Sequence, residues 1–159
     1  MNDLMLFTDG SVNPQTKIGF GAYLAVSNEK FSLDLVKTHV KVRRFEQTSS
    51  TKLELQTLLW ALTDIQALGR RVLVYTDSQN IMGLQGRRDR YEKNDYCSRK
   101  NKRINNYDLY REFYRITDQV NCDFVKVQGH KVSKQKDDLD RFFTLVDRAS
   151  RNALRNNHG

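Results

Sequence analysis

The sequence predicts an α/β protein with a five-stranded mixed β-sheet flanked by α-helices. Three observations carry this prediction. Strand-forming runs without a helical pattern fill the chain as far as Val42, as in an antiparallel meander. From Thr51 onward, apolar residues instead recur at the spacing of an amphipathic helix. A buried-strand run follows that helix, and a strand reached through a helical crossover pairs in parallel with an earlier strand.

In the N-terminal half, three antiparallel strands are predicted to precede one helix. The strands are expected at Leu4–Asp9, Gly19–Ser27 and Phe31–Val42, with a turn at Asn28-Glu29-Lys30 between the last two. The helix is expected from Thr51 to Gly69, where glycine is a typical stop signal. Its apolar stripe consists of Leu55, Leu58, Leu59, Leu62 and Ile65.

In the C-terminal half, the predicted strands and helices alternate. The strands are expected at Val72–Thr76 and Asp123–Val127, and the helices at Asn80–Leu84, Leu109–Val120 and Phe142–Ala153. No internal repeat or domain linker is visible in the sequence. We therefore expect residues 1–159 to form a single domain, since this length is ordinary for one hydrophobic core.

The chain carries a formal net charge of +8, and the excess is concentrated in one segment. Between Gly86 and Ile104, eight basic residues stand against three acidic ones, a local net charge of +5. Clustered Lys and Arg bind polyanions by releasing condensed counterions, so this basic segment predicts a nucleic-acid partner. The alternative is a solvated charged loop that only keeps the protein soluble. Tyr91 and Tyr96 lie among these charges and offer either stacking or packing surfaces.

Composition also bears on the cellular compartment. No apolar run approaches the roughly 18 residues of a membrane span, and Met1 leads into a strand rather than a signal peptide. The two cysteines, Cys97 and Cys122, lack metal-ligand spacing, and we expect both to be reduced thiols. These observations predict a cytoplasmic protein without membrane contact, and a monomer is the simplest expectation.

Four carboxylates provide the strongest functional signal. Asp9 and Asp77 each end a strand-forming run, whereas Glu54 and Asp147 lie in helical patterns. Carboxylates brought together from two strand ends and two helices repel one another, and hard divalent cations such as Mg²⁺ relieve that repulsion. The expected result is a two-metal phosphodiester site. Singly, each residue has an ordinary alternative as a surface glutamate, a turn aspartate or a helix-capping aspartate.

Five short motifs, in order along nearly the whole chain, resemble type 1 ribonuclease H of the bacterial kind. They are Thr8-Asp9-Gly10-Ser11, Lys52-Leu53-Glu54-Leu55, Thr76-Asp77-Ser78-Gln79, Gln128-Gly129-His130 and Val146-Asp147. The predicted order of strands and helices also fits that family's five-stranded mixed sheet. The resemblance implies a metal-dependent endonuclease that hydrolyses the RNA strand of RNA/DNA hybrids and leaves 5′-phosphate and 3′-hydroxyl ends.

The resemblance also implies a role for each motif. Asp9, Glu54, Asp77 and Asp147 would be catalytic carboxylates that hold two Mg²⁺ ions, with Mn²⁺ as a substitute, for in-line attack of water on phosphorus. His130 would be a proton shuttle for the leaving group. The basic segment resembles the basic handle with which some bacterial members grip the hybrid. The residues expected to contact nucleic acid are Ser11, Asn13, Ser50, Thr51, Gln79, Arg87, Arg88, Lys100 and Arg103.

The chain departs from the family pattern at three places. The segment Val12–Lys17 replaces a glycine-rich turn, and Ser50 and Thr51 stand where many members carry paired asparagines that sense the minor groove. The loop before Asp147 is longer than usual and contains Asp140, a rival for the fourth carboxylate. Two other functions stay open: a non-catalytic module that binds hybrid or double-stranded RNA, and a related nuclease or DNA strand-transfer domain.

Overall fold

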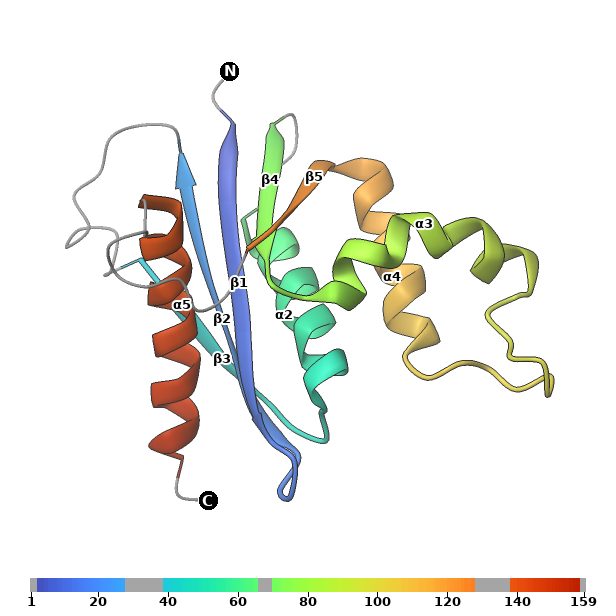
Figure 1. The fold of residues 1–159 in the computed structure, drawn as a ribbon, viewed down its shortest axis with the longest axis horizontal. Coiled ribbons are helices and arrows are strands. Elements are labelled where there is room, and N and C mark those ends of the chain that lie inside the picture. Colours follow the sequence, from blue (N-terminus) through green and yellow to red (C-terminus); the bar gives the residue numbers. More distant parts are fainter. Residues whose placement is uncertain (1–2, 28–38, 66–69, 128–137, 158–159) are drawn as a thin grey trace.

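The computed structural model describes residues 3–27, 39–65, 70–127 and 138–157, and these contain one mixed β-sheet (Figure 1). The sheet has five strands in the order β3-β2-β1-β4-β5. The strands are β1 (Leu4–Asn13), β2 (Ile18–Ser27), β3 (Lys41–Phe45), β4 (Arg71–Thr76) and β5 (Asn121–Lys126). The helices in these residues are α2 (Ser50–Asp64), α3 (Gln79–Lys93), α4 (Tyr107–Gln119) and α5 (Asp138–Arg155). The predicted fold class is confirmed.

The hairpin of β1 and β2 is longer than the sequence pattern predicts. The two strands pair antiparallel along the whole of β1, from Leu4 to Asn13. Asp9 therefore lies inside β1, and the prediction of a strand end at this residue was wrong. The strand-forming run stops at Phe7, but backbone pairing with β2 extends the strand through the polar residues that follow.

The third strand also differs from its prediction, which was Phe31–Val42. The structure has β3 at Lys41–Phe45, paired antiparallel with β2 as the meander requires. Residues 31–38 lie outside the described part of the chain, and residues 39 and 40 are not in a strand. The strand continues through Arg43 and Arg44 because an edge strand can expose charged side chains to solvent.

The C-terminal strands confirm the predicted crossover. β4 pairs in parallel with β1, and β5 pairs in parallel with β4. The helix predicted at Asn80–Leu84 is too short, because α3 extends to Lys93 and makes the first part of the basic segment helical. The apolar pattern in the sequence ends at Leu84, because the later turns of α3 carry arginines. One of them, Arg90, lies over the Tyr91 ring.

Helices cover both faces of the sheet (Figure 1). On one face α2, α3 and α4 enclose a core that includes the buried Leu58 and Phe113. On the other face α5 covers Phe7, whose ring stacks on Tyr75 at 4.8 Å and meets Phe142 edge-on at 5.5 Å. The far end of α3 and the residues that follow it project away from the sheet. The basic segment therefore extends beyond the sheet, although Tyr96 within it belongs to the core under α4.

Two simpler expectations can be compared with the structure. Cys97 and Cys122 are both free thiols, as the sequence predicts. Over the described ranges, no helix is long and apolar enough to cross a membrane.

Helix α2 lies unusually close to the sheet because it crosses three glycines of the hairpin, Gly10, Gly19 and Gly21. A Cβ atom at Gly21 would lie 2.1 Å from Thr57 Oγ1, and one at Gly10 would lie 2.9 Å from a methyl carbon of Leu53. Both distances are shorter than real side chains allow. The glycines therefore let α2, the helix that carries Glu54, pack directly against the hairpin that carries Asp9.

Candidate active site

Asp9 and Asp77 come from neighbouring parallel strands. Phe7 in β1 is paired with Tyr75 in β4, and each aspartate follows two residues later. Side chains two residues apart on a strand share a face, so Asp9 lies on the same face as the stacked rings of Phe7 and Tyr75. Asp77 directly follows Thr76, the last residue of β4. The strand register therefore sets these two carboxylates beside each other.

Asp147 reaches the same place from α5. This helix covers the face on which Asp9 lies, and a hydrogen bond joins the two carboxyl side chains. Close by, the hydroxyl oxygens of Ser11 in β1 and Ser150 in α5 are 3.1 Å apart, and Ser150 also donates to the Asp147 carbonyl at 3.0 Å. These serines fix α5 against β1 within one turn of Asp147.

Glu54 projects from α2, and Ser78 holds its carboxylate. The Ser78 hydroxyl donates to Glu54 Oε2 at 2.6 Å. Ser78 Oγ also accepts from the Ile81 N–H at 3.1 Å, which makes Ser78 the N-cap of α3. The helix cap is thus Ser78 and not Asp77, which removes one ordinary explanation for an aspartate at this point.

Electrostatic interactions link the four carboxylates into one group, which we call the carboxylate cluster. Burial, the hydrogen bond with Asp147 and repulsion from Asp77 together raise the pKa of Asp9 to about 8. Burial also raises the pKa of Glu54; the hydrogen bond from Ser78 opposes that rise, and repulsion from Asp77 adds to it. The fold therefore brings together all four of the carboxylates that the sequence singles out.

The chemistry of the carboxylate cluster suits a hard divalent cation. Its donors are all oxygens, and a cation relieves the mutual repulsion of its charges. In the part of the chain that the structure describes, however, no group of three or more His, Cys, Asp and Glu side chains is arranged to hold a metal ion. Burial, the hydrogen bond with Asp147 and repulsion from Asp77 favour the protonated form of Asp9. The all-oxygen donor set fits Mg²⁺ or Mn²⁺, which would relieve the same repulsion.

Three residues predicted to contact nucleic acid lie beside the carboxylate cluster. Ser50 and Thr51 begin α2, one turn before Glu54, and Gln79 begins α3, two residues after Asp77. Helix N-termini present backbone N–H groups that favour anions such as phosphates. The approach to the carboxylates therefore runs past two helix ends.

Other predicted residues have different places. Asn13 Oδ1 accepts hydrogen bonds from two N–H groups of the following turn, at 2.9 and 3.4 Å, so its side chain closes the hairpin. His130 lies outside the described residues, and its role stays a prediction. Asp140, the rival fourth carboxylate, lies in the first turn of α5, about two turns before Asp147. Asp147 has a hydrogen bond with Asp9, and this bond places it in the cluster.

Several cations of the basic segment are engaged within the protein. Arg88 forms a bidentate pair with Asp118 in α4, with N···O distances of 2.6 and 2.8 Å. Arg103 pairs with Asp95 at 3.3 Å. Arg87 donates two hydrogen bonds, of 2.6 and 2.8 Å, back to the first turn of α3. These contacts give the three arginines structural roles, and their contact with nucleic acid stays a prediction.

The tyrosines of the basic segment also serve packing. Tyr96 is buried, and the Tyr91 ring stacks on Tyr110 with centroids 5.4 Å apart. These contacts favour packing, the second of the two roles that the sequence left open. Lys100, in contrast, is exposed and forms no ion pair with any residue in the described ranges. Among the described residues, it is the one of the four cations predicted to bind nucleic acid that has neither an ion pair nor a side-chain hydrogen bond.

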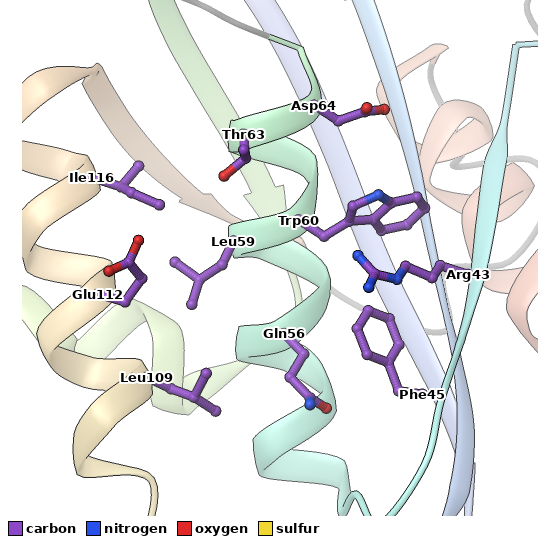
Figure 2. A pocket seen from close by; sticks show the side chains of 10 residues that line it. All are labelled: Arg43, Phe45, Gln56, Leu59, Trp60, Thr63, Asp64, Leu109, Glu112 and Ile116. Carbon is purple, nitrogen blue, oxygen red and sulfur yellow. The ribbon is translucent and has the colours of Figure 1, made fainter.

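Two hollows lie away from the carboxylate cluster. One, of about 340 Å³, lies between β3, α2 and α4 (Figure 2). At its wall the Arg43 guanidinium lies 5.1 Å from the Phe45 ring centroid and 6.0 Å from that of Trp60. The other, of about 850 Å³, lies in the basic segment and is lined by Arg90 and Arg99 among others. Because no cluster carboxylate lines either hollow, both are separate from the candidate active site.

Comparison with known proteins now places the chain. A family model for RNase H matches residues 1–146. The chain belongs to the RNase H family. Among curated relatives, Ribonuclease H of Moorella thermoacetica is 26% identical over 146 residues, which cover 88% of each protein. The predicted family and the ribonuclease H enzyme class are therefore confirmed.

Solved structures agree with this placement at the level of the fold. LC9-RNase H1, described as a type 1 RNase H with the type 2 active-site motif, has a TM-score of 0.71 at 16% identity, covering 96% of this chain and 72% of that one. The foamy viral protease-reverse transcriptase in complex with RNA/DNA hybrid has a TM-score of 0.67 at 9% identity, covering 95% of this chain and 19% of that one. Both comparisons support the order of strands and helices described above.

Ser78 and Ser150 were not predicted as functional residues, and Ser11 was predicted to contact nucleic acid rather than to hold α5 against β1. Ser78 was visible in the sequence as part of a motif, and a serine directly before a helix is a recognisable N-cap signal. Its second contact, with Glu54, joins two elements and has no local signature. The same holds for Ser11 and Ser150, whose hydrogen bond joins residues 139 positions apart.

Proposed function

We propose that this RNase H family member is a metal-dependent endonuclease that hydrolyses the RNA strand of RNA/DNA hybrids, leaving 5′-phosphate and 3′-hydroxyl ends. The carboxylate cluster carries this proposal, because Asp9 interacts with Asp77 and Asp147, and Glu54 interacts with Asp77. Clustered negative charge weakens the binding of a phosphate backbone, so a module that only binds nucleic acid gains nothing from it. A nuclease that uses divalent cations requires such a cluster.

In this proposal, Asp9, Glu54, Asp77 and Asp147 hold two Mg²⁺ ions, for which Mn²⁺ can substitute. When bound, the ions supply the charge that activates the attacking water and stabilises the departing 3′ oxygen. Asp9 interacts with both other aspartates and is the residue best placed to be shared between the ions. His130 remains the proposed proton shuttle for the leaving group.

Substrate contacts are proposed at the two helix ends and in the basic segment. The hydroxyls of Ser50 and Thr51 can bind sugar 2′-hydroxyls or base edges, the groups through which RNA is distinguished from DNA. Gln79, with Ser11, would serve the same surface. Lys100 would bind phosphate from the basic segment, which we propose to act as a handle within one domain of residues 1–159.

The proposal is tested with end-labelled RNA/DNA hybrid, double-stranded RNA, double-stranded DNA and single-stranded RNA, each incubated with Mg²⁺, Mn²⁺ or EDTA. We expect cleavage of the RNA strand of the hybrid only, lost in EDTA and in an Asp9→Asn control. Hybrid binding without cleavage in either metal would favour the non-catalytic module instead. Cleavage of double-stranded DNA would favour the related nuclease or strand-transfer domain.

Two further expectations await their own measurements. A monomeric state can be checked by light scattering at the concentrations used for the assay. A cytoplasmic location can be checked by fractionation of the source cells. Neither result alters the assignment of the carboxylates.

A further inference from the structure

We infer that Ser78 is a positioning residue for Glu54, and that its hydroxyl orients the Glu54 carboxylate for work in the active site. The inference rests on the proposed function for its catalytic meaning. The Ser78 oxygen lies 2.6 Å from Glu54 Oε2, which is a short hydrogen bond. Ser78 is only 3% exposed, so bulk water does not compete for this bond.

The direction of this hydrogen bond is fixed by the other partner of the hydroxyl. A serine hydroxyl carries one proton and accepts through its lone pairs. The Ile81 N–H, 3.1 Å away, can only donate, so the Ser78 oxygen accepts there. The hydroxyl proton is then left for Glu54, whose ionised carboxylate can only accept. Glu54 Oε2 is thereby occupied, and its second oxygen is left for a cation or a water molecule.

The backbone of Ser78 is held from both sides. Its N–H donates to Thr76 Oγ1 at 3.1 Å, and its carbonyl accepts from the Met82 N–H at 3.2 Å. Thr76 ends β4, whereas Met82 lies in the first turn of α3. Because Ser78 is tied to a strand and a helix, the Glu54 side chain must adjust to Ser78 and not the reverse.

Glu54 needs such a partner because its surroundings oppose its charge. Burial and repulsion from Asp77 both disfavour the ionised carboxylate. A glutamate side chain has several freely rotating bonds, so without a hydrogen bond it would turn away from the neighbouring aspartate. Ser78 therefore keeps Glu54 beside Asp77, at the position in which both can serve the same site.

Three substitutions separate this positioning role from helix capping. Ser78→Thr keeps both the cap and the hydroxyl proton. Ser78→Gly removes the hydroxyl but keeps most of the capping stability, whereas Ser78→Ala removes both. We expect only Ser78→Ala to lower the melting temperature clearly, by about 3 °C. The Gly and Ala variants should nevertheless be impaired equally in every property that depends on Glu54.

Two measurements show whether the function of Glu54 depends on the Ser78 hydroxyl. The Mn²⁺ affinity of the protein without substrate is measured from the electron paramagnetic resonance signal of unbound Mn²⁺, and kcat and KM are measured on the hybrid with Mg²⁺. We expect the Gly and Ala variants to bind Mn²⁺ about tenfold more weakly and to lose about tenfold in kcat, with KM changed less than about twofold. Ser78→Thr should match the wild type in both.

The outcomes distinguish this inference from the proposed function. Wild-type Mn²⁺ affinity and kcat in Ser78→Gly would overturn the inference and leave Ser78 as a helix cap alone. A wild-type protein that binds Mn²⁺ but cleaves no hybrid would overturn the proposed function, and the Mn²⁺ titration would still decide the role of Ser78. A wild-type protein that binds no Mn²⁺ would overturn both.

Discussion

The carboxylate cluster and the basic segment arrange like charges in opposite ways. In the cluster, the fold holds Asp9 close to Asp77 and Asp147. Burial and these two neighbours raise the pKa of Asp9 to about 8. In the basic segment, the fold pairs part of the positive charge with acidic side chains, as in the bidentate pair of Arg88 with Asp118 and the pair of Arg103 with Asp95. The first region gathers like charges against their repulsion, whereas the second pairs some of its charges within the protein and exposes others.

This difference shows which charges to associate with function. An ion pair that is satisfied within the fold, such as Arg88 with Asp118, gains little by exchanging its partner for a phosphate. An exposed cation without an ion pair to any described residue, such as Lys100, has more to gain. We therefore expect fewer basic residues to contact nucleic acid than their number in the segment suggests.

The largest expected effect comes from removing one charge of the cluster. Asp9→Asn keeps the shape of the side chain but removes an anionic ligand, and metal stabilisation of a phosphoryl transition state is worth several kcal/mol. We expect kcat on RNA/DNA hybrid to fall about 1,000-fold, measured with end-labelled substrate in Mg²⁺. Asp77→Asn should behave in the same way. Hybrid cleavage at the wild-type rate in either variant would show that the carboxylate cluster is not the active site, and its contrast with the basic segment would lose its functional meaning.

The same cluster should make stability depend on pH. The pKa of Asp9 is raised from 3.8 to about 8 in the folded protein, so between these values the folded state binds a proton that the unfolded chain has released. The free energy of unfolding therefore falls as pH rises through this window, by about 3 kcal/mol between pH 5 and pH 8. Urea denaturation at several pH values measures this change.

Asp9→Asn provides the control for the pH dependence. The variant cannot ionise at this position, so its stability should vary less between pH 5 and pH 8, and it should exceed that of the wild type at pH 8. A pH profile that is the same in both proteins would show that Asp9 ionises normally in the fold. Repulsion among the cluster carboxylates would then not lower the stability of the fold, and this difference from the basic segment would disappear.

The close approach of α2 to the sheet depends on the hairpin glycines, and Gly21→Ala tests it. The added Cβ would meet Thr57 Oγ1 at 2.1 Å and two further Thr57 carbons at 2.9 Å, so the helix must shift. We expect a loss of about 2 kcal/mol in the free energy of unfolding, measured by urea denaturation, because overpacking costs this much. Gly86→Ala is the matched control, since a Cβ there meets nothing within 4 Å.

Much of the fold could be predicted from local sequence patterns, and the errors of that prediction have physical causes. Apolar periodicity located α2 and α5 because each helix buries one stripe against the sheet. It failed at the end of β1, where residues from Gly10 to Asn13 are in a strand only because β2 pairs with them. It also failed in α3, whose C-terminal turns are anchored by arginine contacts and by Tyr91 rather than by an apolar stripe.

The candidate site divides in the same way. Each carboxylate could be singled out because its neighbours in sequence form a recognisable context. The contacts that orient them could not, because hydrogen bonds such as Ser78 to Glu54 and Ser11 to Ser150 join elements that are distant in sequence. Long-range side-chain pairs have no periodicity, so only the assembled fold defines them.

The smallest expected effect concerns two cations of the basic segment, the paired Arg88 and the exposed Lys100. Arg88→Gln removes a bidentate ion pair that joins α3 to α4, and we expect it to lower the free energy of unfolding by about 1 kcal/mol. Lys100→Gln should leave stability within about 0.5 kcal/mol of the wild type, because its side chain is exposed. Urea denaturation measures both variants under the same conditions.

For the binding of hybrid, the two variants should rank in the opposite order, with Lys100→Gln affected more than Arg88→Gln. Loss of one phosphate contact reduces the slope of log affinity against log salt by about 1, so Lys100→Gln should bind hybrid with a shallower salt dependence. Arg88→Gln should keep the wild-type slope, since its guanidinium is already committed to Asp118. Fluorescence anisotropy with labelled hybrid, in EDTA to prevent cleavage, measures the slopes. If Arg88→Gln flattened the slope and Lys100→Gln did not, satisfied ion pairs would be the ones that open to bind phosphate, and the contrast between the two regions would have to be abandoned.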